Sequence, residues 1–252
     1  MKQAWKTKEE MEAFERTRKK DDLSCLISDQ SSEENFKAEK KDETLELVDI
    51  GANLAHRSFQ FDFPDVLRRA LENGVSKIFI TGTSVINSRK AVQLASRHPG
   101  YLYTTAGIHP HDAKHAKDPL SMQELKSIVL KNPEIVRAVG ECGLDFDRNF
   151  SSPEEQISAF RAQLELASEL RLPVFLHERK AHRKFLEIMK EFRPRLTRAV
   201  VHCFTGTREE LQEYLKLDLH IGITGWINDE RRGLALRKIV NLIPLSRLMI
   251  ET

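Results

Sequence analysis

Eight short apolar runs alternate with amphipathic segments between Leu45 and Thr252. The runs do not alternate apolar with polar residues, which is typical of strands buried on both faces. Eight such strands with helical segments between them predict an α/β fold, a (β/α)₈ barrel. An open doubly wound sheet would give the same alternation, and the count of eight favours the barrel. The expected strands are Leu45–Ile50, Lys77–Gly82, Leu102–Gly107, Val136–Gly140, Pro173–His177, Ala199–Cys203, Leu219–Thr224 and Leu248–Glu251.

Helix signals lie between these runs. Ser152 followed by Pro153 predicts an N-cap with proline at the first helical position. Asn73 followed by Gly74 predicts the C-terminal stop of an earlier helix. The helical segments expected from the pattern include Asp62–Asn73, Ser84–His98, Glu154–Leu170, Glu209–Leu217 and Arg231–Leu242.

Residues 1–44 differ in composition from the rest of the chain. They contain 10 Lys/Arg and 12 Asp/Glu and few apolar groups, so we expect a charged, mostly disordered N-terminal extension. Residues 45–252 carry 30 basic and 26 acidic side chains, a weak positive excess that suits a local basic groove rather than a broad nucleic-acid coat. The barrel is therefore expected to occupy residues 45–252.

The composition of the chain excludes several classes of protein and indicates a cellular compartment. With 40% hydrophobic and 31% charged residues, the chain is neither fibrous nor largely disordered. No window approaches eighteen apolar residues, so no membrane span or membrane partner is expected. Three widely spaced cysteines (Cys25, Cys142 and Cys203) argue against a disulfide framework and for a reducing compartment, cytoplasmic or nuclear.

Polar side chains follow several of the predicted strands. Barrel enzymes place their chemistry at the C-terminal ends of strands, and there stand Glu141, His177 and His202. A lone histidine at a strand end is commonly structural, and Glu141 taken alone has a simpler use, capping a turn or pairing with Arg179. Three ionisable side chains on successive strands are harder to explain in this way, because buried ionisable groups need partners. A divalent metal site with one or two ions would supply that partner.

Several motifs in this order resemble the TatD family of metal-dependent deoxyribonucleases. The resemblance covers about residues 47–252 and implies a TIM barrel of the amidohydrolase type. The motifs that carry it are Gly107–His111, Gly140–Phe146, His177–Arg179, Val201–Gly206, Ile221–Trp226, Asp229–Gly233 and Leu248–Thr252.

The resemblance assigns roles to individual residues. Glu141 matches the shared catalytic carboxylate, and His177 and His202 match the imidazole ligands. His109 matches the histidine beside the substrate phosphate, which makes it both a catalytic and a substrate-binding candidate. Mg²⁺ is the expected metal, with Mn²⁺ and Zn²⁺ as alternatives. Three further candidates for substrate binding are Arg179 for phosphate, Trp226 for stacking and Arg231 for the backbone.

Three departures from the family pattern stand out. Gly51 and Asn53 replace a His-x-His pair found in many members, which implies a weaker metal position. Glu178 stands where a small residue is usual and offers either a ligand or a partner for Arg179. The family's Asp and final helix do not follow Thr252, so we expect a barrel lacking its final helix, marginally stable and nearly inactive.

The expected function is a metal-dependent nuclease, a 3′–5′ exonuclease that hydrolyses phosphodiester bonds of DNA, single-stranded or at chain ends. A monomer is expected. One alternative is a hydrolase of small molecules on the same type of barrel, against which Gly51, Asn53 and Glu141 argue. The other is an inactive paralogue that binds nucleic acid without cleaving it.

Overall fold

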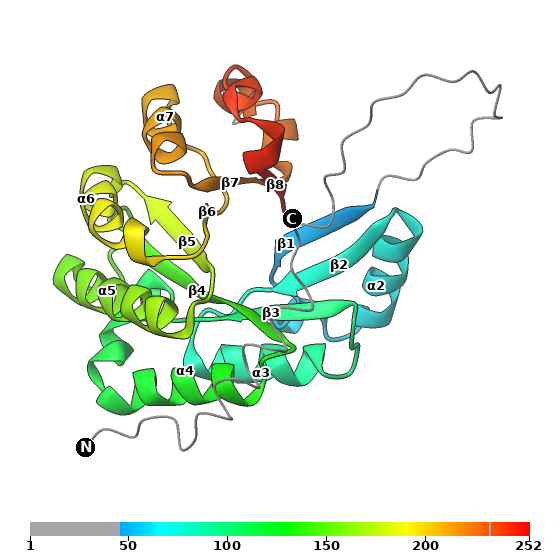
Figure 1. Cartoon of the computed structure of the whole chain (residues 1–252). Coiled ribbons are helices and arrows are strands. Elements are labelled where there is room, and N and C mark those ends of the chain that lie inside the picture. Colours follow the sequence, from blue (N-terminus) through cyan, green and yellow to red (C-terminus); the bar gives the residue numbers. More distant parts are fainter. Residues whose placement is uncertain (1–45, 232) are drawn as a thin grey trace, which may run out of the picture. The chain divides into compact units, whose positions relative to one another are not determined.

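A computed structural model of the chain describes residues 46–231 and 233–252. Eight parallel strands close into a barrel in the order β1 to β8, which confirms the predicted fold class (Figure 1). The extension predicted for residues 1–44 lies outside the described residues. The strands are β1 Leu47–Ala52, β2 Val75–Ile80, β3 Leu102–Ala106, β4 Val136–Asp145, β5 Val174–Arg179, β6 Ala199–Val201, β7 His220–Ile223 and β8 Leu248–Ile250.

Helices follow the strands and lie outside them (Figure 1). The predicted start at Ser152 is confirmed as a capping box, in which Ser152 and Glu155 satisfy each other's backbone N–H groups. The predicted stop is also confirmed, since Asn73 is the C-cap and Gly74 has φ +82°. The α-helices are α2 Phe63–Glu72, α3 Val85–Ala95, α4 Pro119–Lys131, α5 Pro153–Leu170, α6 His182–Phe192, α7 Arg208–Lys216 and α8 Gly233–Arg237.

The core lies between the helices and the outer face of the barrel. Helix α5 shows the pattern, because it packs on β4 and its buried residues include Phe160, Leu164 and Ala167. Burying a large apolar side chain contributes roughly 1.5–3 kcal/mol, so one such helix face stabilises the barrel substantially. None of the helices among the described residues is long and apolar enough to cross a membrane.

The structure corrects two predicted boundaries. Strand β4 does not stop at Gly140 but continues to Asp145, so Glu141 lies within the strand. Glycine lets the strand continue: at Gly143, where φ is +149°, a Cβ would meet the His177 carbonyl at 1.9 Å. The last predicted helix, Arg231–Leu242, is divided into α8 and the 3₁₀ turn η6, Val240–Leu242. Strand β8 ends two residues before Thr252.

Candidate metal centre

Glu141 lies at the centre of a group of three imidazoles at the C-terminal mouth of the barrel. Its Oε1 is 2.7 Å from His202 Nε2, 3.0 Å from His177 Nδ1 and 3.2 Å from His109 Nε2. The four side chains come from β4, β5 and the segments that follow β3 and β6. The structure therefore brings together the four residues that the sequence singled out.

The path of β4 places the Glu141 carboxylate. The register between β4 and β5 shifts between Gly140 and Cys142, so the strand is irregular at Glu141. Gly140 has φ +135°, and a Cβ there would meet the Phe175 carbonyl at 2.2 Å. A larger residue at position 140 would push β4 away from β5 and move Glu141 with it.

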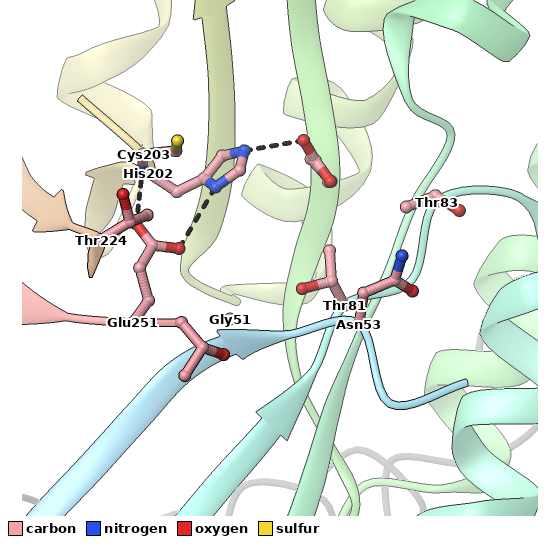
Figure 2. Close-up of a pocket in the computed structure, with 10 residues that line it drawn as sticks. Gly51, Asn53, Thr81, Thr83, His202, Cys203, Thr224 and Glu251 are labelled. Carbon is pink, nitrogen blue, oxygen red and sulfur yellow. Dashed lines mark hydrogen bonds and ion pairs between the residues drawn. The ribbon is translucent and has the colours of Figure 1, made fainter. Parts of the chain in front are cut away.

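A second carboxylate, Glu251, holds His202 from the other side. Glu251 Oε2 is 3.3 Å from His202 Nδ1, and the Cys203 backbone N–H donates to Glu251 Oε1 (Figure 2). A proton on Nδ1 is thereby directed at Glu251, so Nε2 is the nitrogen that would bind a metal after losing its own proton. The sequence offered Glu251 as part of the final motif and, beside Glu178, as a residue that could supply a missing carboxylate; its place directly after β8 is the signal for its role here.

Two glycines make room for Glu251. A Cβ at Gly51 would lie 2.6 Å from Glu251 Oε2, and a Cβ at Gly222 would lie 2.3 Å from Oε1. Gly51 also belongs to the pocket at the mouth of the barrel (Figure 2). The lining residues of this pocket are Gly51, Asn53, Thr81, Thr83, Glu141, His202, Cys203, Thr224, Glu251 and Thr252. The glycine at position 51 thus has a local steric reason in this chain.

His177 has a looser carboxylate partner. Asp145 Oδ2 is 3.7 Å from His177 Nε2 and 2.7 Å from His111 Nε2. His177 Nε2 is buried and has no hydrogen-bond partner within the described residues. Asp145 favours a proton on Nε2 and leaves Nδ1 facing Glu141. Asp145 and His111 were part of recognised motifs, but sequence reasoning did not place them in the site.

His109 directs an N–H group at Glu141. Its Nδ1 accepts the backbone N–H of His111 at 3.1 Å, so its proton lies on Nε2 and points at Glu141. The potential ligand atoms of His109, Glu141 and His177 lie within 4.8 Å of one another, and proximity alone would allow that set to hold an ion. The far ring nitrogens of His202 and His177 face Glu251 and Asp145, which favours these two histidines as ligands once the nitrogens beside Glu141 lose their protons, whereas His109 is a hydrogen-bond donor.

Charge interactions shift the pKa values in the cluster. Burial opposes ionisation of Glu141, but the His202 charge and hydrogen bonds from the imidazoles outweigh it and hold the pKa of Glu141 well below its usual range. Burial likewise opposes charging of His202, yet the two carboxylates beside it raise its pKa well above the usual value. For His109, burial is the stronger influence and lowers the pKa.

The donor set fits a divalent metal. His177 Nδ1 and His202 Nε2 are 3.4 Å apart. Ligands of a tetrahedral ion at about 2.0–2.1 Å from the metal are separated by roughly this distance. One buried carboxylate with two imidazoles whose far nitrogens face further carboxylates matches the composition of catalytic metal sites. Glu141, His177 and His202 would hold the ion.

The three predicted substrate residues lie on loops and strand ends around this centre. Arg179 ends β5 and is paired with Asp147 at 2.8 Å. Trp226 belongs to the 3₁₀ turn η5, Gly225–Asn228, after β7 and is 41% exposed. Arg231 follows η5 and donates its backbone N–H to Asp229. None of these side chains contacts Glu141 in the described part of the chain.

Glu178 corrects an expectation from the sequence. Its Oε1 accepts the Ala181 N–H at 2.8 Å, and its Oε2 accepts the Tyr214 hydroxyl at 2.9 Å. Both partners belong to the helical layer, so Glu178 is neither a metal ligand nor the partner of Arg179. Side chains alternate along a strand, and this carboxylate has the opposite orientation to that of His177.

A closed (β/α)₈ barrel with a buried carboxylate and imidazoles at its C-terminal mouth is the framework of a metal-dependent hydrolase of the amidohydrolase type. A family model described as "TatD related DNase" matches residues 48–252. The chain belongs to this family, and it is a metal-dependent nuclease, a hydrolase acting on ester bonds of nucleic acid. The resemblance stated from the sequence is confirmed.

Relatives and solved structures agree with this assignment. A protein from Erwinia billingiae named "3'-5' ssDNA/RNA exonuclease TatD" is 52% identical over 206 residues, which cover 82% of this chain and 78% of the relative. A protein of the same name from Edwardsiella piscicida is 50% identical over 206 residues, with the same two shares. A TatD family hydrolase from Entamoeba histolytica superposes with a TM-score of 0.75 at 34% identity, covering 82% of this chain and 73% of that one.

Proposed function

We propose that this chain is a 3′–5′ exonuclease that removes nucleotides from single-stranded DNA or RNA with Mg²⁺ in its site, and with Mn²⁺ or Zn²⁺ as substitutes. Polarity and substrate follow the names of the relatives that are half identical to it. The observation that carries the proposal is the arrangement at Glu141, where three imidazole nitrogens converge on one carboxylate oxygen and two of the rings have a second carboxylate behind them.

Each residue of the cluster has a distinct role in this proposal. Glu141, His177 and His202 hold one divalent ion, or share Glu141 between two, and Glu251 and Asp145 orient the imidazoles from behind. When bound, the ion lowers the pKa of a water and polarises the scissile phosphate. His109 has its Nε2–H beside the carboxylate, from where it would donate to a phosphate oxygen once the ion neutralises Glu141.

Substrate contacts extend from this centre. If its ion pair with Asp147 opens, the Arg179 guanidinium is suited to a forked contact with a substrate phosphate. Arg231, which follows η5, would contact the sugar-phosphate backbone of the substrate. Trp226, partly exposed after β7, would stack on a base.

Two cysteines in the described residues, Cys142 and Cys203, are free thiols, which supports a reducing compartment, cytoplasm or nucleus. A monomer is sufficient, because one barrel supplies the whole cluster.

The test uses single-stranded oligonucleotides labelled at either end. With Mg²⁺, a 5′-label should pass through a ladder of shortened products, whereas a 3′-label should appear at once as a mononucleotide. EDTA should stop both. A His109→Ala variant should lower kcat/KM with metal affinity retained. Binding of the oligonucleotide without shortening, in Mg²⁺ and in Mn²⁺, would favour a non-cleaving nucleic-acid binder instead, and release of the 5′-label first would reverse the polarity.

A further inference from the structure

We propose that Phe150 is the base-stacking platform of this site, on which a nucleobase beside the scissile phosphate is placed. This proposal rests on the proposed function and names a substrate-positioning residue that is outside the metal cluster. Phe150 follows β4 in the loop that leads to α5, and its side chain is 58% exposed. A large aromatic side chain in water at the mouth of an active site is the kind of surface on which bases stack.

A continuous row of rings connects Phe150 with the metal centre. The Phe150 ring meets His111 edge to face, with centroids 4.8 Å apart and planes at 86°. His111 is 4.2 Å from His109 and 6.4 Å from His177, again by ring centroids. The phenyl ring is therefore separated from the proposed metal ligands by one imidazole. A nucleotide whose phosphate lies at Glu141 can reach it with its own base or the next one.

The loop holds Phe150 in place before any substrate arrives. The Asp145 carboxylate accepts the backbone N–H groups of Asp147 and Arg148, each at 3.0 Å. Ser151 donates its hydroxyl to the His111 carbonyl at 3.0 Å, which fixes the loop to the segment after β3. A ring whose position is already set loses little conformational freedom when a base stacks on it.

The surroundings of Phe150 suit a polyanion. Arg148 in the same loop and Lys114 in the 3₁₀ turn η3, Pro110–Lys117, are both exposed. The Lys114 backbone N–H donates to Ser151 Oγ at 3.1 Å, so Lys114 belongs to a segment that is hydrogen-bonded to the loop in which Arg148 lies. Positive charge beside an exposed aromatic ring is the combination used by proteins that bind single strands.

Phe61 provides a matched control. It is 93% exposed in the loop after β1, on the same end of the barrel, and makes no ring contact with the histidine cluster in the described residues. If any exposed phenyl ring at the mouth assisted binding, Phe61 and Phe150 would be equivalent. If the contact with His111 matters, only Phe150 has an effect.

The test measures binding and turnover separately. A fluorescein-labelled oligonucleotide with phosphorothioate linkages at its 3′ end reports binding in Mg²⁺ by anisotropy. A natural oligonucleotide and an oligomer of abasic deoxyribose phosphates, a diester without a base or any other aromatic ring, report turnover. We expect Phe150→Ala to weaken binding and raise KM for the oligonucleotide roughly 5- to 100-fold, the range of one lost stacking contact. Turnover of the base-free diester, the melting temperature and both properties of Phe61→Ala should be unchanged.

Further comparisons sharpen the result. Phe150→Trp should restore binding, and an abasic residue near the 3′ end should weaken binding to the native chain but have little further effect on Phe150→Ala. Equal oligonucleotide affinity of Phe150→Ala and the native chain would overturn the inference, as would an equal loss on the base-free diester. A native chain that binds in this Phe150-dependent way without cleaving would overturn the proposed exonuclease and leave the stacking platform intact.

Discussion

The two histidines offered to the metal differ in what holds them. His202 lies between two carboxylates, Glu141 at 2.7 Å and Glu251 at 3.3 Å. His177 has Glu141 at 3.0 Å on one side, while Asp145 on the other is 3.7 Å away and closer to His111. Glu251 is enclosed by Gly51 and Gly222, whereas Asp145 begins an exposed loop. The carboxylate behind His202 serves one histidine, whereas the carboxylate behind His177 is shared with His111 and with the loop that follows β4.

Because of this difference, we expect variants at the two carboxylates to affect metal binding and substrate binding to different degrees. Among the described residues, the Glu251–His202 pair has no hydrogen bond to the loop that carries Phe150, so disturbing the pair should affect the ion first. Asp145 contacts His177, His111 and the loop that carries Phe150, so disturbing it should affect ion and substrate together. The following predictions are ordered by the size of the effect expected.

Glu141→Gln should have the largest effect, because it removes the charge shared by both histidines. Metal affinity and kcat/KM should each fall by well over about 100-fold, more than the loss usual for a residue behind a ligand. Glu178→Gln is the matched control, since that carboxylate contacts Ala181 and Tyr214 instead, and it should keep most of the activity. Calorimetric metal titration and oligonucleotide turnover provide the measurements. Wild-type metal affinity in Glu141→Gln would remove Glu141 from the centre.

Glu251→Gln should come next, with metal affinity reduced about 10- to 100-fold. Its amide no longer attracts the Nδ1 proton of His202, so the wrong tautomer becomes accessible. Gly51→Ala should have a similar effect by displacing the carboxylate, since its Cβ would lie 2.6 Å from Oε2. The double variant should be no worse than the more impaired single one. Additive losses would show that Gly51 acts on something other than Glu251.

Asp145→Asn should lower metal affinity less than Glu251→Gln, by about 10-fold or less, because its separation from His177 is already long. It should also raise KM for oligonucleotides, since the loop carrying Phe150 loses its acceptor for the backbone N–H groups of Asp147 and Arg148. Titration gives the loss of metal affinity and steady-state kinetics gives the rise in KM. The ratio of these two effects is then compared with the ratio for Glu251→Gln. A loss of metal affinity equal to that of Glu251→Gln would show that the carboxylates behind His177 and His202 do not differ in their effect on the metal.

Deleting residues 1–44 should have the smallest effect, with metal affinity unchanged within error. All the proposed ligands lie between β3 and the segment after β6, and the family match begins at residue 48. Calorimetric titration of the shortened chain is the check. A clear loss of affinity would show that the extension contributes to the site.

The sequence predicted the barrel, because apolar runs are local signals, and the structure brings together the four residues that the strand ends and the family resemblance had singled out. It did not predict that β4 runs on through Glu141 to Asp145, since two glycines in a run normally indicate the end of a strand. Glu178 and His177 are adjacent, and the alternation of side chains decides which one enters the site. Which ring nitrogen carries the proton depends on contacts between residues distant in sequence, such as His202 with Glu251.

The position of a bound ion tests the central claim most directly. Crystals of the protein soaked with Mn²⁺ and measured at the manganese absorption edge should show a strong anomalous peak in coordinating contact with Glu141 Oε1, His177 Nδ1 and His202 Nε2. His109 Nε2 should stay outside the coordination shell as a hydrogen-bond donor. A peak bound by His109 in place of His202, or no peak at Glu141 in a protein that cleaves DNA with Mn²⁺, would contradict the account.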